Sequence, residues 1–263
     1  MAKRPLSKLV NLVESASTSA PIEKQFITDL LYSIEHIADS SSYTPSRTFK
    51  PSSIGGCPRN IYYQLIGAET QKEGHSSATN VGILESGTDR HERIQKAICD
   101  MKKSGIDCEY IDIETFVKSR GLDYIEIKGK SGIETRCFWK DIPLSFLTDG
   151  IIRYKGKYYI LEIKTMNMNK FIESRDVRDE HKSQGICYSM AFGIEDVLYL
   201  YECRDTLAKK AFIYHVTDEM RGGLMNKINY IKQCVADGTP PEVEGNRNKC
   251  RYCNYQHICE KRG

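Results

Sequence analysis

The sequence contains no apolar run approaching the roughly 20 residues that a membrane-spanning helix needs. Its basic N-terminus, MAKRPLSKLVNLVES, lacks the apolar core of a secretory signal peptide. No internal repeat is recognisable, which excludes the repeat architectures. We therefore expect a soluble, cytoplasmic protein without a membrane partner.

A complete phosphate-binding loop is also missing. The stretch KGKSG at 128–132 ends like such a loop, but Tyr124 stands five residues before Gly129, where the motif requires glycine. The sequence therefore encodes no nucleotide-driven motor. If the substrate is DNA, either a partner unwinds it or the substrate is an end or a single strand.

What is present suits a globular protein. The 263 residues are 40% hydrophobic and 28% charged, enough to bury a core in one large domain or one and a half. A formal net charge of +3 permits nucleic acid as a partner without requiring it.

The first 53 residues predict a separate N-terminal part. Apolar residues at helical spacing predict an amphipathic helix over 20–38, and a Ser/Pro-rich linker follows over 39–53. The alternatives for this linker are a flexible connection and a segment that stacks on and neutralises a single strand. The side chains for that second role are Tyr43, Arg47, Phe49 and Lys50.

Residues 54–263 predict an α/β domain with a mixed central sheet flanked by helices. A helix is expected from Thr88, a plausible N-cap, to about residue 103. Two more helices are expected at 178–192 and 218–236. Alternating apolar residues predict strands at 109–117, 123–128, 136–141, 150–154, 158–165, 196–203 and 211–216.

The segment FLTDGIIRYKGKYYILEIKT, residues 146–165, places charge inside an apolar strand. Residues two apart share a strand face, so Glu162 and Lys164 point to the same side. A two-residue turn at Lys155 and Gly156 would pair Tyr154 with Lys157 and set Asp149 opposite Glu162.

Two carboxylates about 4 Å apart repel by roughly 1 kcal/mol in water and about 4 kcal/mol at an effective dielectric of 20. A divalent cation such as Mg²⁺ or Mn²⁺, which prefers oxygen ligands, would compensate that repulsion. The alternative is a solvated edge strand with an exposed Glu-Lys face.

Four short motifs occur in an order that resembles the RecB-like branch of the PD-(D/E)XK nuclease superfamily. The resemblance covers about residues 54–260, although Thr148 stands where the family has proline before the aspartate. It implies a restriction-endonuclease-like fold and metal-dependent hydrolysis of DNA. The motifs are Gly87-x3-His91, Asp149, Glu162-Ile163-Lys164 and Gln184-x3-Tyr188.

The resemblance implies a role for each motif residue. Lys164 would position water or stabilise developing charge, beside the carboxylates of Glu162 and Asp149. Gln184 and Tyr188 share a helix face and would orient DNA or the lysine; the alternative is ordinary helix packing. The implied metal ligands are His91, Asp149, Glu162 and the backbone carbonyl of Ile163.

The position of His91 has its own alternative. It lies on the apolar stripe of its helix with Ile94 and Ile98, so it faces inward. A lone histidine there is more often a core residue with satisfied hydrogen bonds, and the resemblance favours a metal ligand instead.

Ten cysteines are present, and six of them are scattered as packing residues. The other four, Cys57, Cys250, Cys253 and Cys259, form a three-plus-one set that suits zinc or an iron-sulfur cluster equally by spacing. The set resembles iron-sulfur RecB-like nucleases, including the AddB nuclease domain and CRISPR-associated adaptation nucleases. That resemblance implies a 4Fe-4S cluster joining the N- and C-terminal segments; His257 is a possible replacement ligand.

Arg59 and Tyr63 match the Cys-x-Arg-x3-Tyr run of the same nucleases and can reach a phosphate or a base. Packing over the cluster is the alternative. Taken together, the motifs predict a metal-dependent DNA exonuclease that acts on ends or single strands in recombination, repair or end processing. A helicase, recombinase or integrase is the expected kind of partner. The alternatives are a CRISPR adaptation nuclease that trims DNA for an integrase and a non-catalytic DNA-binding module.

Overall fold

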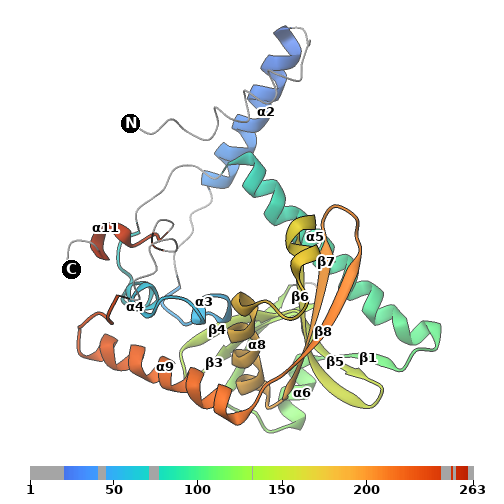
Figure 1. Cartoon of the computed structure of the whole chain (residues 1–263), viewed down its shortest axis with the longest axis vertical. Helices are drawn as coiled ribbons and strands as arrows, with labels where there is room; N and C mark the ends of the chain where they lie inside the picture. The colour runs from blue at the N-terminus through green and yellow to red at the C-terminus, as the bar shows by residue number, and fades with distance from the viewer. Residues whose placement is uncertain are drawn as a thin grey trace. The chain divides into compact units, whose positions relative to one another are not determined.

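The computed structural model describes residues 21–40, 46–70, 77–131, 133–243, 250 and 253–259. The chain forms two compact units. The first consists of residues 1–44 and 72–88, and the second of residues 45–71 and 89–263. Helix α5 (Ala78–Asp100) contributes residues to both units (Figure 1).

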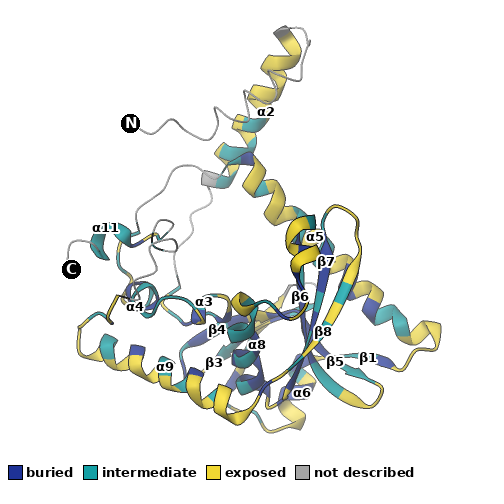
Figure 2. Cartoon of the chain, in the orientation of Figure 1, coloured by how far each residue is buried: buried dark blue, intermediate teal, exposed yellow. Residues whose placement is uncertain are grey.

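In the first unit, α2 (Pro21–Ser40) is the amphipathic helix that the sequence predicts. The backbone nitrogen of Ala78, at the start of α5, donates to Glu35 of α2 over 3.0 Å. Much of the apolar side of α2 is exposed, as Figure 2 shows by colour. No described helix of the chain is long and apolar enough to cross a membrane.

The second unit contains a five-stranded mixed sheet, as expected. Its order is β1-β5-β6-β7-β8, with β6 and β7 parallel and every other neighbouring pair antiparallel. The strands are β1 (Cys108–Ile111), β5 (Gly150–Tyr154), β6 (Lys157–Met166), β7 (Asp196–Cys203) and β8 (Lys209–His215).

Helices cover both faces of this sheet (Figure 1). Ile94 and Ile98 of α5 pack on Leu161 and Ile163 of β6, one apolar side of the strand. The opposite face packs against α6 (Ile113–Ser119) and α8 (Asp179–Phe192), outside which α9 (Asp218–Ala236) packs on α8 and α4. The shorter helices are α3 (Pro51–Ile54), α4 (Pro58–Ile66), η1 (Met101–Ser104), α7 (Met168–Glu173) and α11 (Gln256–Cys259).

A second, antiparallel sheet consists of β2 (Ile125–Ser131), β3 (Glu134–Trp139) and β4 (Leu144–Thr148). Strand β4 was not expected from the sequence, and it matters because it leads directly into Asp149. The expected strand at 109–117 is wrong beyond residue 111. Asp112 accepts a hydrogen bond from the backbone nitrogen of Thr115 over 2.9 Å and so caps α6 there.

The expected linker is wrong for residues 46–53. Phe49 is 1% exposed, and its backbone pairs with Pro143 and Ser145 on the way into β4. Its ring cannot stack on DNA, because it lies in the core. Tyr43 lies outside the described residues. Helix α5 also starts at Ala78, ten residues before the expected N-cap Thr88.

Candidate active site

The β5–β6 hairpin has the predicted register. Lys155 and Gly156 both have positive φ, 48° and 79°, as a two-residue type I′ turn requires. Tyr154 pairs with Lys157, as predicted, and Gly150 pairs with Leu161. Asp149, one residue before Gly150, is therefore level with Glu162.

Asp149 is held by its side chain at the end of β5. Its Oδ2 accepts a hydrogen bond from the backbone nitrogen of Ile163 over 2.6 Å. Its Oδ1 lies 3.1 Å from Nδ1 of His91. In a β-strand the N–H and C=O of one residue point to the same edge. The carbonyl of Ile163 therefore points to the edge where Asp149 lies.

The backbone of Asp149 is fixed by two residues that the sequence analysis missed. Its carbonyl accepts hydrogen bonds from Nε2 of Gln95, over 3.0 Å, and from the hydroxyl of Tyr110. Gly150 has φ +145°, and a Cβ there would collide with Tyr110. The signal available in the sequence was the spacing of Gln95, four residues after His91, which places both on one face of α5.

Glu162 is an acid in the core. It is 2% exposed, and its Oε1 lies 2.6 Å from Nζ of Lys164. Its Oε2 is buried and accepts no hydrogen bond from the described residues. Burial first, and the charge of Asp149 second, raise the pKa of Glu162 to about 8, against the opposing effect of Lys164.

His91 lies between two carboxylates. Its ring, with Glu134 and Asp149, forms a group whose ligand atoms all lie within 4.8 Å of one another. Burial lowers the pKa of His91, but the carboxylates of Asp149 and Glu134 outweigh that effect and raise it to about 10. A protonated imidazole thus balances the negative charge. Glu134, on β3, was missed because no local pattern relates it to Asp149.

A directed chain of hydrogen bonds connects Lys164 to β4. Nζ of Lys164 donates to Oε1 of Gln184 over 2.9 Å. Nε2 of Gln184 donates to the hydroxyl of Tyr188 over 2.9 Å, and that hydroxyl donates to the carbonyl of Leu147 over 3.0 Å. The structure therefore brings together both residues of the Gln-x3-Tyr motif and the lysine.

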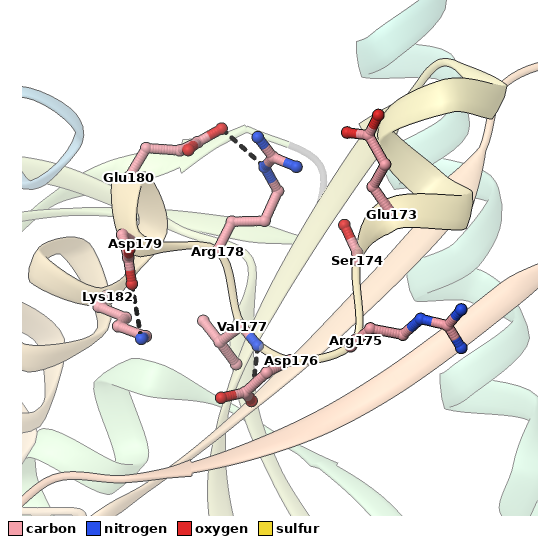
Figure 3. Close-up of a pocket in the computed structure, with 9 residues that line it drawn as sticks. All are labelled: Glu173, Ser174, Arg175, Asp176, Val177, Arg178, Asp179, Glu180 and Lys182. Atoms are coloured by element: carbon pink, nitrogen blue, oxygen red, sulfur yellow. Dashed lines mark hydrogen bonds and ion pairs between the residues drawn. The ribbon is translucent and has the colours of Figure 1, made fainter.

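A cavity of about 380 Å³ is lined by residues 173–180 and 182, where α7 ends and α8 begins (Figure 3). None of the acids described above lines it. Four of its charged residues pair with one another, Arg178 with Glu180 over 2.8 Å and Lys182 with Asp179 over 2.7 Å. The candidate site is therefore the cluster around Asp149, not this cavity.

The cysteine segments lie together in the second unit. Cys57 is the N-cap of α4, and Asn60 in the next turn donates to the sulfur of Cys253 over 3.1 Å. Within the described residues, the four sulfurs do not form a group with all members within 4.8 Å of one another. The described residues therefore show neither a zinc site nor an iron-sulfur site at these cysteines.

Arg59 and Tyr63 pack at these cysteines. Arg59 donates to the carbonyl of Pro241 over 2.7 Å and to the sulfur of Cys259 over 3.6 Å. Tyr63 is 3% exposed, and its ring contacts that of Tyr255. Their placement favours the packing alternative, and a contact of either residue with DNA stays a prediction.

No family model and no curated protein matches the sequence. Among solved structures the chain is similar to SSO0001, with a TM-score of 0.45 and 17% identity over 89% of this chain and 96% of that chain. It is also similar to an alkaline exonuclease, LHK-Exo from Laribacter hongkongensis, with a TM-score of 0.45 and 10% identity over 74% of this chain and 90% of that one.

LHK-Exo in complex with dAMP gives a TM-score of 0.45 and 11% identity over 73% of this chain and 89% of that one. Such low similarity assigns no activity. The side chains around Asp149 are therefore the basis for assigning a function.

Proposed function

We propose that the chain is a metal-dependent deoxyribonuclease of the PD-(D/E)XK type. One observation carries the proposal: Asp149 contacts His91 and the backbone of Ile163, next to Glu162, whose carboxylate pairs with the ammonium group of Lys164. A merely solvated Glu-Lys strand face is not compatible with this geometry, because Glu162 is buried.

The residues fit a divalent cation. The orphaned Oε2 of Glu162 is a buried carboxylate oxygen that lacks a hydrogen-bond donor among the described residues, and such an atom is costly unless a cation binds it. His91, Asp149, Glu162 and the carbonyl of Ile163 are the proposed ligands. When bound, Mg²⁺ or Mn²⁺ would lower the pKa of the attacking water and offset charge on the phosphodiester.

Lys164 is the proposed catalytic residue of the chain. Its Nζ lies 2.6 Å from Oε1 of Glu162, and its side chain is only partly exposed. This position suits a group that orients water or stabilises charge on a phosphate oxygen. Gln184 accepts from Nζ and so fixes its direction. Gln184 and Tyr188 are thus proposed to position the lysine, the second of the two roles that the sequence suggested.

The substrate proposed is DNA ends or single strands, and the reaction is exonucleolytic hydrolysis in recombination, repair or end processing. The missing motor motif supports this choice, because a chain without a motor acts where no unwinding is needed or with a helicase or recombinase partner.

Incubating the protein with end-labelled single-stranded and duplex DNA, with Mg²⁺ or Mn²⁺, tests the proposal. We expect shortening of the labelled strand by wild type and at least a hundredfold slower digestion by Glu162→Ala and by Lys164→Ala. Lys103→Ala is the matched control, because that exposed lysine pairs with Asp100 on the surface. Inert wild type, or active Glu162→Ala protein, rejects the proposal.

We also propose a structural 4Fe-4S cluster at Cys57, Cys250, Cys253 and Cys259. Support comes from the N–H···S hydrogen bonds of Asn60 and Arg59, which favour anionic sulfur, and from the position of Cys57 at a helix N-terminus. The cluster would tie α4 to the C-terminal segment. Iron and acid-labile sulfide are expected in anaerobically prepared protein, whereas zinc without iron would end this part of the proposal.

A second candidate is an adaptation nuclease that trims DNA for an integrase. The exposed apolar residues of α2 favour it, because such a surface suits a bound partner. They are Ile22, Phe26, Tyr32 and Ile37, which are 74%, 65%, 66% and 66% exposed. DNA cleavage that is unchanged by an added integrase, with no complex in size-exclusion chromatography, would leave only the stand-alone nuclease. Metal-independent DNA binding without cleavage would instead indicate a non-catalytic module.

A further inference from the structure

Glu202 is a completely buried carboxylate at the end of β7. Three cations surround it: Nη2 of Arg93 at 2.6 Å, Nζ of Lys209 at 3.0 Å and Nη1 of Arg90 at 3.5 Å. The side chain of Glu202 is 0% exposed. None of these four residues belongs to the candidate active site.

The cluster has more positive charge than Glu202 needs. Burial favours the neutral acid, but Arg93 and Lys209 hold the pKa of Glu202 below its ordinary value, so the group is ionised. One carboxylate between Arg93 and Lys209 alone leaves a local charge of about +1. The side chains of Arg93 and Lys209 remain 48% and 42% exposed, and each has N–H donors beyond the one that faces Glu202.

Strand register places this cluster relative to the active site. Glu202 pairs with Thr165, whereas Asp149 is level with Glu162 on the other side of β6. Three residues along the strand and two strand spacings across the sheet give a separation of about 14 Å between the backbone positions of Asp149 and Glu202. That distance spans roughly two to four nucleotides of one strand, depending on how extended the strand is.

We propose that Arg90, Arg93 and Lys209 bind a backbone phosphate of the DNA strand whose scissile bond lies at Asp149, with Glu202 holding the three cations in place. This inference rests on the proposed nuclease function for its substrate. The guanidinium groups suit a phosphate because their planar donors match its oxygens. A phosphate contact carries no base readout, so the site acts on DNA of any sequence.

The competing explanation is that the cations only neutralise Glu202. The two explanations differ in the salt dependence of DNA affinity, because each phosphate contact releases counterions. We would measure binding of a fluorescein-labelled oligothymidine by anisotropy between about 50 and 200 mM salt, in the Lys164→Ala background. Arg93→Gln and Lys209→Gln should each weaken binding and lower the slope of log Kd against log salt by about 0.7.

Arg153→Gln is the matched control, because Arg153 is a half-exposed arginine that pairs with Glu109 at the other end of β5. It should leave the slope unchanged. Arg93→Lys keeps the charge and should keep the slope. If Arg93→Gln fails to fold, Lys209→Gln decides alone. Lys209 lies on the outer strand β8, and its side chain is 42% exposed.

Slopes for Arg93→Gln and Lys209→Gln that equal the slope for Arg153→Gln overturn the phosphate site, as does a wild type that binds no DNA. The nuclease proposal fails separately. A wild-type chain that binds DNA with the predicted slope changes but cuts nothing keeps the phosphate site and rejects the nuclease.

Discussion

Oδ2 of Asp149 lies 2.6 Å from the backbone nitrogen of Ile163, so the strand that carries Glu162 and Lys164 also fixes the acid of the neighbouring strand. Asp149→Asn keeps an oxygen that can accept this N–H and removes the negative charge. We expect lower thermal stability without metal near neutral pH, because Glu162 is protonated there and Asp149 loses its ion pair with the protonated imidazole of His91.

The same variant should lose most of the stabilisation that Mn²⁺ gives to wild type, which would be measured as a shift in Tm on adding the ion. Asp100→Asn, an exposed acid of α5 paired with Lys103, is the control and should keep that shift. A full Mn²⁺ shift in Asp149→Asn protein would show that Asp149 is not a ligand.

The chain of hydrogen bonds from Lys164 to Leu147 gives a second prediction. Tyr188→Phe leaves Nε2 of Gln184 and the carbonyl of Leu147 without their partner in a partly buried place. Each unsatisfied group costs about 1 to 3 kcal/mol, so stability should fall by that order. Because Nζ of Lys164 loses its fixed direction, we expect kcat to fall more than KM changes.

Tyr230→Phe is the matched control for this prediction, since Tyr230 is 49% exposed on α9. Steady-state kinetics with labelled DNA give kcat and KM for both variants. A pure rise in KM in Tyr188→Phe protein would place the tyrosine at the DNA rather than behind the lysine.

The raised pKa of Glu162 predicts how metal-free stability depends on pH. The folded protein keeps a proton on this acid up to about pH 8, whereas the unfolded chain releases it near about pH 4.3. The contribution of the Glu162 proton to the free energy of unfolding is therefore complete below the pKa of the unfolded chain. It is lost as pH rises through the pKa of the folded protein. His91, whose pKa is raised to about 10, acts in the same direction.

We therefore expect metal-free Tm to fall as pH rises from about 5 to about 8, and the Tm gain from Mn²⁺ to grow over that interval, because the ion competes with protons. Glu162→Gln should flatten the metal-free profile. Glu114→Gln, an exposed acid that pairs with Lys118 on α6, should not. A flat wild-type profile would contradict the buried, protonated state of Glu162.

Local patterns in the sequence were sufficient to predict the register of the hairpin and the shared helix face of Gln184 and Tyr188. The two-residue turn set the register of β5 and β6, because its loop length fixes which residues face each other. The spacing of Gln184 and Tyr188 placed both on one helix face, and the structure joins them by a hydrogen bond.

Long-range contacts were not predictable in this way. Glu134 reaches His91 from another sheet, and Phe49 enters the core from a stretch whose composition suggests a linker. Both depend on how separate elements pack, which no single periodicity encodes. Asp112 caps α6 because its carboxylate competes for the backbone at that point, so local hydrogen bonding overrode the apolar alternation that suggested a longer strand.

Gln95 and Tyr110 give the last prediction. Both donate to the carbonyl of Asp149, so each holds the aspartate in place without touching a ligand atom. Gln95→Leu fills the same buried space but removes one donor, and we expect a loss of about 1 to 2 kcal/mol in unfolding free energy with weaker Mn²⁺ binding by calorimetry. Gln64→Leu, which also removes a donor to a backbone carbonyl but lies far from Asp149 in the chain, is the control.

The double variant Gln95→Leu with Tyr110→Phe should lose more Mn²⁺ affinity than the two single losses added together, because the carbonyl then has no donor left from either residue. The pair acts on one atom, and non-additivity is the signature of that shared partner. Losses that simply add, or a Gln95→Leu protein with wild-type Mn²⁺ affinity, would mean that the side-chain contacts of Asp149 with His91 and Ile163 position it on their own.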